Sequence, residues 1–370
     1  MHLGKPKIRV LVVDDSALAR KIISNGLSSD PRLEVIGTAN DPTSAYAMLV
    51  KHQPDVMTLD IEMPEMDGVT FLKKVMPFYP TPTVIVSSLA ESGKKLALDA
   101  LEAGAVDIIA KPKIGVADGL PLLINDICER VVTASETDVS HYRQPGKNSR
   151  GLKDDFHPQN TFISPTITEN NNDALHETTD RVIAIGASAG GVATLGKILP
   201  MFPADSPGIV IVQHMPAGFT TSFAERLNNL TPMQVKEAQH GDRVRQGLIL
   251  IAPGGDNHLE IRRSGGEYRI ALTTGEKVSG HRPSVDVMFL SVARYVGRNT
   301  AAAILTGMGE DGAEGLLAIR KAGGRTFAQD EKSCVVFGMP GAAWRKGAAE
   351  LLLPLNDIPN HLLKAVHSMV

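Results

Sequence analysis

Short apolar runs alternate along most of the chain with stretches whose apolar residues recur at helical spacing. Before residue 133, uninterrupted apolar runs predict buried strands, and the stretches between them predict helices. The predicted strands are residues 8–13, 35–39, 56–59, 83–86 and 106–110. The predicted helices are residues 17–27, 42–51, 68–76 and 93–103. This alternation predicts an α/β domain with an open parallel sheet.

The same rhythm resumes after residue 180. Apolar runs there predict strands at residues 182–185, 209–212, 248–252 and 302–305. We detect no sequence repeat between the two halves. Because each half shows the alternating pattern on its own, we expect two separate doubly wound parallel-sheet α/β domains.

The segment between the two halves has a different composition. Only 10 of the 47 residues from 133 to 179 are apolar, about half of the whole-chain fraction of 43%. Such a density does not offset the conformational entropy lost on ordering a chain, so we expect a flexible linker. An irregular surface insertion in one larger domain is the alternative. The expected organisation is a first domain at 6–132, a linker at 133–180 and a second domain at 181–370.

Composition and charge narrow the class of protein. The 370 residues carry a net charge of −3 and 4% aromatic residues, which argues against nucleic-acid binding. The two cysteines, Cys128 and Cys334, are too few for a disulfide framework or a cysteine-based zinc site. The N-terminus lacks the pattern of a signal peptide, and no apolar run approaches the roughly 18 residues that span a bilayer. We therefore expect a cytoplasmic protein without direct membrane insertion.

Polar residues follow the predicted strands of the first half. Asp14 and Asp15 end the first strand, Asp60 the third, Ser87 the fourth and Lys111 the fifth. Parallel strands bring their carboxyl ends to one edge, where three carboxylates would repel one another unless a hard dication such as Mg²⁺ lay between them. Lys111 would balance an added phosphoryl group, and the Ser87 hydroxyl would bond its oxygens.

These positions, in the contexts Val-Asp-Asp-Ser, Leu-Asp-Ile-Glu-Met-Pro, Val-Ser-Ser and Ala-Lys-Pro, resemble the response-regulator receiver domain. The resemblance implies a flavodoxin-like (βα)5 fold and phosphorylation of Asp60 by a partner phosphohistidine. It also implies Mg²⁺ held by Asp14, Asp15 and Asp60. One position departs from the pattern: Ile108 stands where the family often has an aromatic residue.

A strand running into a glycine-rich turn and a helix opens the second half. The sequence Gly-Ala-Ser-Ala-Gly at residues 186–190 contains the G-x-S-x-G pattern with Ser188 at its centre. Such a turn presents a serine hydroxyl at a helix N-terminus, which favours developing negative charge. A phosphate-binding turn would look similar, so the pattern alone leaves both interpretations open.

A nucleophilic serine needs a base, and the base needs an orienting carboxylate. His214 ends the next apolar strand, and Asp311 lies in a glycine-rich loop after the strand at 302–305. These positions place both at the sheet edge where we expect Ser188. The chain order Ser, His, Asp differs from that of the α/β-hydrolases, so the chain is not assigned to them.

A second histidine competes for the role of base. His281 and Arg282 precede Ser284 and Asp286, so all three letters of a triad fall within six residues. Triads assemble from separate elements, and neighbours in sequence rarely reach that geometry. We expect His281 and Arg282 to form a wall of the site or to orient the substrate; a structural role is the alternative.

Together with the loops at 213–216, 252–255 and 281–286, these motifs resemble the chemotaxis protein-glutamate methylesterases. The resemblance implies that Ser188 is the nucleophile, His214 the general base and Asp311 its orienter, without a cofactor. It implies hydrolysis of glutamate γ-methyl esters on methyl-accepting chemoreceptors, deamidation of receptor glutamines, and a chemotaxis histidine kinase as phosphodonor. The backbone N–H groups of Ala189 and Met308 are the candidates for the oxyanion hole. The family often has Thr at the position of Ala189.

The two halves together predict regulation. A tethered receiver can dock over the neighbouring site, and phosphorylation of Asp60 would then release it. A receiver-regulated receptor-binding module without catalysis and a general serine esterase or peptidase are the alternatives. A DNA-binding effector is disfavoured because the second half has no basic recognition helix.

Overall fold

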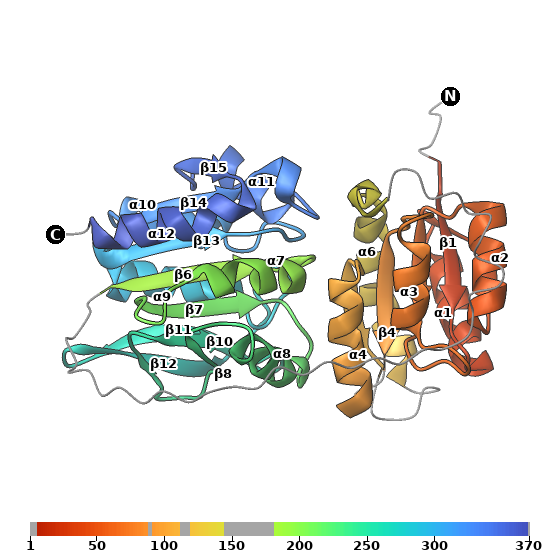
Figure 1. Cartoon of the computed structure of the whole chain (residues 1–370), viewed down its shortest axis with the longest axis horizontal. Helices are drawn as coiled ribbons and strands as arrows, with labels where there is room; N and C mark the ends of the chain where they lie inside the picture. Colours follow the sequence, from red (N-terminus) through yellow and green to blue (C-terminus); the bar gives the residue numbers. More distant parts are fainter. Residues whose placement is uncertain (1–5, 88–90, 112–118, 144–180, 369–370) are drawn as a thin grey trace.

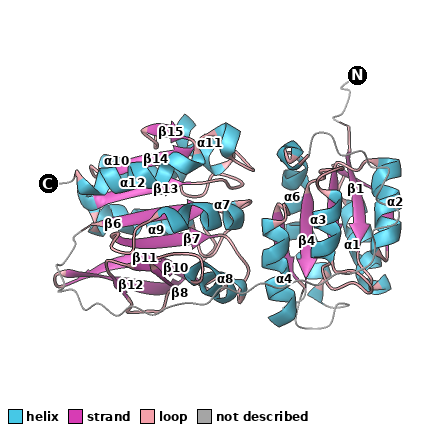
Figure 2. Ribbon diagram, viewed as in Figure 1, coloured by secondary structure: helices cyan, strands magenta, loops and turns pink. Residues whose placement is uncertain are grey.

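The computed structural model describes residues 6–87, 91–111, 119–143 and 181–368. They form two α/β domains that lie side by side (Figure 1). Each has a central sheet with helices packed against it (Figure 2). Helices α4 (Glu91–Glu102) and α6 (Ile124–Ser135) of the N-terminal domain face the C-terminal domain.

The N-terminal domain is built on a five-stranded parallel sheet of order β2-β1-β3-β4-β5. Its strands are β1 (Ile8–Val13), β2 (Leu33–Ala39), β3 (Val56–Leu59), β4 (Thr83–Ser87) and β5 (Asp107–Ala110). Besides α4 and α6, its helices are α1 (Ala17–Ser29), α2 (Pro42–His52) and α3 (Gly68–Val75). Asp41 and Asp67 cap α2 and α3 by accepting backbone N–H groups, which fixes where these helices begin.

The apolar runs of this domain are buried on both sides of the sheet, as a parallel sheet between two helix layers requires. The order places β1 beside β3, so Asp14 and Asp60 leave adjacent strands at the same edge. The strands and helices predicted for this half are all present.

The structure changes the interpretation of the start of the predicted linker. Helix α6 continues to Ser135, and a 3-10 turn follows at Ser140–Tyr142. Val139 is buried, and Tyr142 packs against the N-terminal domain core. Residues 133–143 are therefore ordered, because a few well-placed apolar side chains are enough to anchor a short segment. Residues 144–180 lie outside the described residues.

The C-terminal domain contains a seven-stranded parallel sheet of order β15-β14-β13-β6-β7-β10-β8. Its strands are β6 (Val182–Ala187), β7 (Gly208–Gln213), β8 (Gln234–Glu237), β10 (Leu248–Ile251), β13 (Thr300–Ile304), β14 (Arg325–Gln329) and β15 (Leu351–Leu353). Its helices are α7 (Gly191–Ile198), α8 (Phe219–Asn228), α9 (Val285–Tyr295), α10 (Ala313–Lys321), α11 (Met339–Arg345) and α12 (Ile358–His367).

A small antiparallel sheet was not predicted. It contains β9 (Arg243–Val244), β11 (Asn257–Ser264) and β12 (Glu267–Thr274), in the order β11-β12-β9. Its hairpin turns at Gly265, and the segment after β12 leads into α9. Within the described residues, no helix is long and apolar enough to cross a membrane.

The first strand of this domain, β6, lies in the middle of the large sheet, and later strands are added on both sides of it. Strand β6 lies between β7 on one side and β13 on the other. Ligand sites of open parallel sheets form where the strand order reverses in this way, beyond the carboxyl ends of the strands. The loops after β6, β7 and β13 therefore meet at one place.

Candidate active site

Ser188 lies in the tight turn between β6 and α7. Its backbone N–H donates to the carbonyl oxygen of Thr306 at 3.0 Å, which ties the turn to the loop after β13. Gly190 caps α7 with a φ of 74°, a conformation that disfavours residues with a Cβ. The turn places Ser188 at the N-terminus of α7, and the side chain is mostly buried at 8% exposure.

The loop after β13 approaches Ser188 closely. A Cβ on Gly307 would lie 2.8 Å from the Cβ of Ser188, so only glycine fits there. The next residue is Met308, the predicted oxyanion donor. The N–H groups of Met308 and Ala189 make no hydrogen bond to any other described residue. One of these amides follows Ser188 in the chain and the other follows Gly307, which packs on Ser188, so both remain candidates for an oxyanion hole.

Two buried polar side chains hold this turn in place. Gln213 donates through Nε2 to the carbonyl oxygen of Ser188 at 2.8 Å. The Thr306 hydroxyl donates to the carbonyl oxygen of Ala189 at 3.0 Å and accepts the N–H of Val336 at 2.9 Å. Sequence reasoning missed both residues; their only signal was a polar side chain at the end of an apolar strand.

His214 and Asp311 meet at the same edge. The Nε2 atom of His214 lies 2.8 Å from Oδ2 of Asp311, and both side chains are buried. The acceptor-only carboxylate assigns the ring proton to Nε2. The other nitrogen, Nδ1, is buried and has no hydrogen-bond partner among the described residues. It is the nitrogen left to accept a proton, as a general base must.

The carboxylate of Asp311 accepts hydrogen bonds from the N-terminus of α9. The Ser284 hydroxyl donates to Oδ1 at 2.7 Å, and the backbone N–H groups of Val285 and Asp286 donate to the carboxylate at 2.8 and 3.0 Å. Burial favours the protonated acid, but the bond from His214 and these donors outweigh it and hold the pKa of Asp311 below its ordinary value. Asp311 is therefore an ionised, fixed acceptor for His214.

The two predicted wall residues have different surroundings. The ring of His281 stacks on that of His214, with centroids 3.7 Å apart and an interplanar angle of 11°. Arg282 instead donates to the carbonyl oxygens of Gly255 and Gly275 and pairs with Asp256 at 2.9 Å. Arg282 thus joins the β10–β11 loop to the start of its own segment between β12 and α9.

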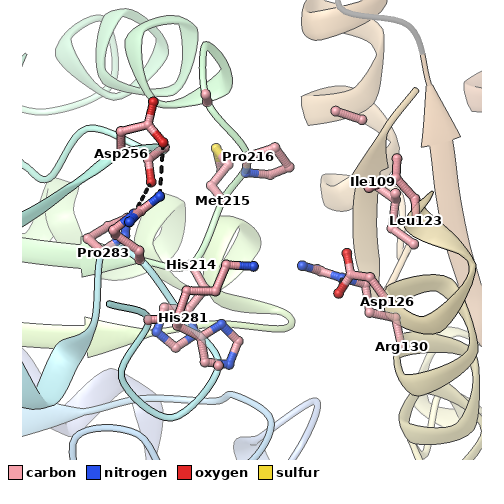
Figure 3. A pocket seen from close by; sticks show the side chains of 16 residues that line it. Ile109, Leu123, Asp126, Arg130, His214, Met215, Pro216, Asp256, His281 and Pro283 are labelled. Atoms are coloured by element: carbon pink, nitrogen blue, oxygen red, sulfur yellow. Dashed lines mark hydrogen bonds and ion pairs between the residues drawn. The ribbon is translucent and has the colours of Figure 1, made fainter. Parts of the chain in front are cut away.

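These residues border a cavity of about 310 Å³ between the domains. In Figure 3, His214 and His281 lie on one side of it, and Asp126 and Arg130 of α6 lie on the other.

The acidic residues of the N-terminal domain also come together. Ligand oxygens of Asp14, Asp15 and Asp60 lie within 4.8 Å of one another, and Asp14 and Asp60 are buried. Nζ of Lys111 pairs with Asp60 at 2.5 Å and with Asp14 at 2.9 Å. Burial raises the pKa of Asp60 to about 6, Lys111 opposes the rise, and Asp14 adds to it. Three carboxylates of this kind fit Mg²⁺, which prefers hard oxygen ligands.

Ser87 and Ile108 lie on adjacent strands beside this cluster. The Ser87 hydroxyl is buried and has no hydrogen-bond partner among the described residues. Ile108 is 2% exposed and pairs in register with Ile85 of β4. It also lines a narrow gap that contains Ser188.

The N-terminal domain covers Ser188 directly. The carbonyl oxygen of Val106 accepts the N–H of Gly190 at 3.3 Å. The gap shared by Val106, Ile108, Ser188 and His214 encloses only about 10 Å³, room for about one water. At the periphery, Arg226 of α8 pairs with Asp99 and Glu102 of α4. No substrate fits between Ser188 and β5 in this arrangement.

Comparison with known proteins decides the family. Residues 183–362 match the family model described as CheB methylesterase, and residues 10–115 match the response regulator receiver domain. A protein-glutamate methylesterase/protein-glutamine glutaminase of Syntrophotalea carbinolica is 52% identical over 352 residues, covering 95% of this chain and 96% of the relative. The chain belongs to this family. The predicted family and enzyme class are thereby confirmed.

Other similar proteins agree with this assignment. The protein-glutamate methylesterase/protein-glutamine glutaminase 2 of Pseudomonas aeruginosa is 48% identical over 357 residues, covering 96% of this chain and 96% of the relative. The crystal structure of the Thermotoga maritima CheB methylesterase catalytic domain is 40% identical, with a TM-score of 0.49, and covers 50% of this chain and 97% of that one. The predicted fold class, a receiver domain followed by an α/β catalytic domain, is confirmed.

Proposed function

We propose that this protein hydrolyses glutamate γ-methyl esters on the cytoplasmic parts of chemoreceptors, using Ser188, His214 and Asp311. The observation that carries the proposal is the convergence of three adjacent strand ends, where His214 bonds Asp311 at 2.8 Å and Gly307 packs against Ser188. The matching family supplies the reaction class.

The reaction follows from the positions of these groups. Ser188 Oγ attacks the ester carbonyl carbon while Nδ1 of His214 takes the hydroxyl proton. Asp311 keeps the opposite proton on Nε2 and stabilises the imidazolium. The proton then passes to the methoxide as methanol leaves, and a glutamyl ester remains on Ser188. Water, deprotonated by His214, attacks that ester; the proton returns to Ser188, and free glutamate is released.

The carbonyl oxygen becomes negatively charged in both steps. The N–H groups of Ala189 and Met308 are the donors available beside Ser188, and a single such donor contributes about 10²-fold or more in rate. A backbone amide serves as well from Ala189 as from the Thr that relatives often have. Deamidation of a receptor glutamine is the same acyl transfer with ammonia as the leaving group.

Phosphorylation of Asp60 is the proposed control. Asp14, Asp15 and Asp60 would hold Mg²⁺, which supplies positive charge to the transferring phosphoryl group. Lys111 already lies beside Asp60 and would pair with a phosphoryl oxygen. The unpaired Ser87 hydroxyl would donate to another. A chemotaxis histidine kinase is the phosphodonor that the receiver class implies.

The unphosphorylated receiver would inhibit by covering Ser188. The Val106 contact to Gly190 and the closed gap beside Ile108 support this step. A change at Ser87 would reach Ile108 through the adjacent strands β4 and β5, since Ser87 pairs with Ala110 and Ile85 with Ile108. Movement of β5 would then weaken the contact with the turn that carries Ser188.

One assay separates this function from the alternatives. The full chain is incubated with methylated receptor, Mg²⁺ and acetyl phosphate, and released methanol is measured. We expect release by the native chain and a loss of roughly 10³-fold or more for Ser188→Ala. Undiminished release by Ser188→Ala would refute the assignment. Binding of receptor without any release would favour a non-catalytic module, and equal rates on unrelated esters would favour a general esterase.

A further inference from the structure

The stacking contact between His281 and His214 takes no part in the chemical steps proposed above. The His281 ring lies almost parallel to that of His214, with 3.7 Å between centroids and 11° between planes. Figure 3 shows the two rings together at the edge of the interdomain cavity. Arg282, its neighbour in sequence, is occupied by bonds to Gly255, Gly275 and Asp256.

We propose that His281 is a positioning residue that fixes the ring plane of His214, and with it the position of Nδ1, beside the gap that His214 shares with Ser188. This role differs from the substrate wall expected from the sequence. It rests on the proposed function of the Ser188, His214 and Asp311 site.

The His214 ring needs such a support. Its bond to Asp311 fixes Nε2, but a single hydrogen bond leaves the ring free to turn about that contact. Nδ1 has no partner among the described residues to limit this rotation. A ring stacked on one face restricts it, since a turn out of plane would bring the two imidazoles into collision. Catalysis is sensitive to misplacements of about 1 Å.

His281 is itself held firmly. Its backbone exchanges hydrogen bonds with Val278, at 2.9 Å from its N–H and 3.1 Å to its carbonyl oxygen. Three residues later, Ser284 caps α9 and donates to Asp311. One short segment therefore contacts both the base and its carboxylate partner: its start stacks on His214, and its end binds Asp311.

The charge state of His281 suits this role. Burial, and next the positive charge that His214 would carry, lower the pKa of His281 to about 3, while Asp311 opposes the shift. Arg130 of the receiver and Lys277 lower it further. A neutral ring does not repel the imidazolium that forms on His214 during the reaction, and an aromatic face attracts a cation.

Four variants of the full chain test the proposal: His281→Ala, His281→Asn, His281→Phe and, as control, His361→Ala. The control removes a histidine on α12 whose ring contacts Phe327 edge-to-face at 5.9 Å. Each is assayed for kcat and KM on a peptide containing glutamate γ-methyl ester, with Mg²⁺ and acetyl phosphate. The rate of Ser188 modification by a fluorophosphonate is measured in parallel.

We expect His281→Ala and His281→Asn to lower kcat and the modification rate about tenfold, with KM unchanged. His281→Phe keeps a flat ring and should remain within about threefold of the native chain, as should the control. If His281→Ala does not fold, His281→Asn still shows the effect of losing the aromatic ring.

The proposal is overturned if kcat is unaffected, if only KM rises, as a substrate wall predicts, or if phenylalanine is as slow as alanine. Failure of the proposed function looks different, because Ser188→Ala would then release methanol at the native rate.

Discussion

The Ser284 hydroxyl donates a hydrogen bond to Oδ1 of Asp311 at 2.7 Å, in a site where Ser284 is fully buried. Ser284 is also the N-cap of α9, so one side chain begins the helix and binds the carboxylate at its N-terminus. A helix N-terminus favours a negative charge. The residue that orients the base is therefore itself oriented by a helix.

Replacing Ser284 by alanine removes both bonds. We expect a loss of about 1–2 kcal/mol in the free energy of unfolding, the usual effect of removing an N-cap. We also expect kcat to fall several-fold, because Asp311 loses one of its donors. Urea unfolding and methanol release measure the two effects. Asp41→Ala, which removes the cap of α2 in the receiver, should lose similar stability while the fully phosphorylated enzyme keeps its kcat. Equal kcat for both variants would contradict a role of Ser284 in holding Asp311.

Most of the fold could be predicted because buried parallel strands are continuous apolar runs. Strands β1, β6 and β7 are marked in this way, and the residue after each strand is then placed at a known edge of the sheet. That rule alone is enough to predict that Ser188, His214 and Asp311 lie at one sheet edge. It works because the strand direction, not the detailed packing, decides which side chains meet.

The remaining features depend on contacts that sequence spacing does not encode. The cluster from His281 to Asp286 does not form a triad of its own, as expected, but its geometry around Asp311 and His214 depends on how α9 docks against the loop after β13. The hairpin β11–β12 carries polar residues on its exposed face, and its longest apolar run is the three residues 270–272 of β12. The Arg282 bonds depend on loops that only the fold brings together.

His281 makes stability depend on pH in a predictable direction. Burial and the charge of His214 lower its pKa from 6.5 to about 3 in the folded protein, so between those values the unfolded chain binds more protons. Stability contributed by neutral His281 is thus complete above about pH 6.5 and is lost as pH falls toward 3. In His281→Phe this loss is absent. Urea unfolding from pH 4.5 to 7 should give a flatter profile for that variant, and parallel profiles would contradict the burial of a neutral ring.

Ser87 should matter only after phosphorylation. Its hydroxyl is buried and unpaired among the described residues, so Ser87→Ala removes no hydrogen bond that joins Ser87 to them. We expect unchanged or slightly higher stability of the unphosphorylated protein and a clear loss of activation by acetyl phosphate. The ratio of methanol release with and without acetyl phosphate measures this. Thr83 lies on the same strand as Ser87, and its hydroxyl donates to the carbonyl oxygen of Thr81, just before β4; Thr83→Val is the control and should keep the ratio. Full activation of Ser87→Ala would show that the hydroxyl does not contact the phosphoryl group.

The ion pairs of Arg226 offer a way to open the interface without touching the site. Arg226 of α8 contacts Asp99 and Glu102 of α4, and all three side chains are roughly one-third exposed. Solvent screening limits such pairs to about 0.2–1 kcal/mol each. Arg226→Glu replaces both attractions with repulsion, so we expect unphosphorylated methanol release to rise about three- to tenfold. Release from the phosphorylated protein should hardly change, because its interface is already open.

The matched control is Arg325→Glu, which breaks a pair with Glu350 inside the catalytic domain. It reverses the same charge without affecting the interface, and its unphosphorylated activity should stay at the native value. A chain cut to residues 181–370 sets the upper limit of activity that loss of the receiver can produce. If Arg226→Glu leaves unphosphorylated activity unchanged while that shorter chain is strongly activated, the receiver is held by the contact of Val106 with Gly190 and the apolar packing around it. If neither is activated, the receiver does not inhibit by covering Ser188.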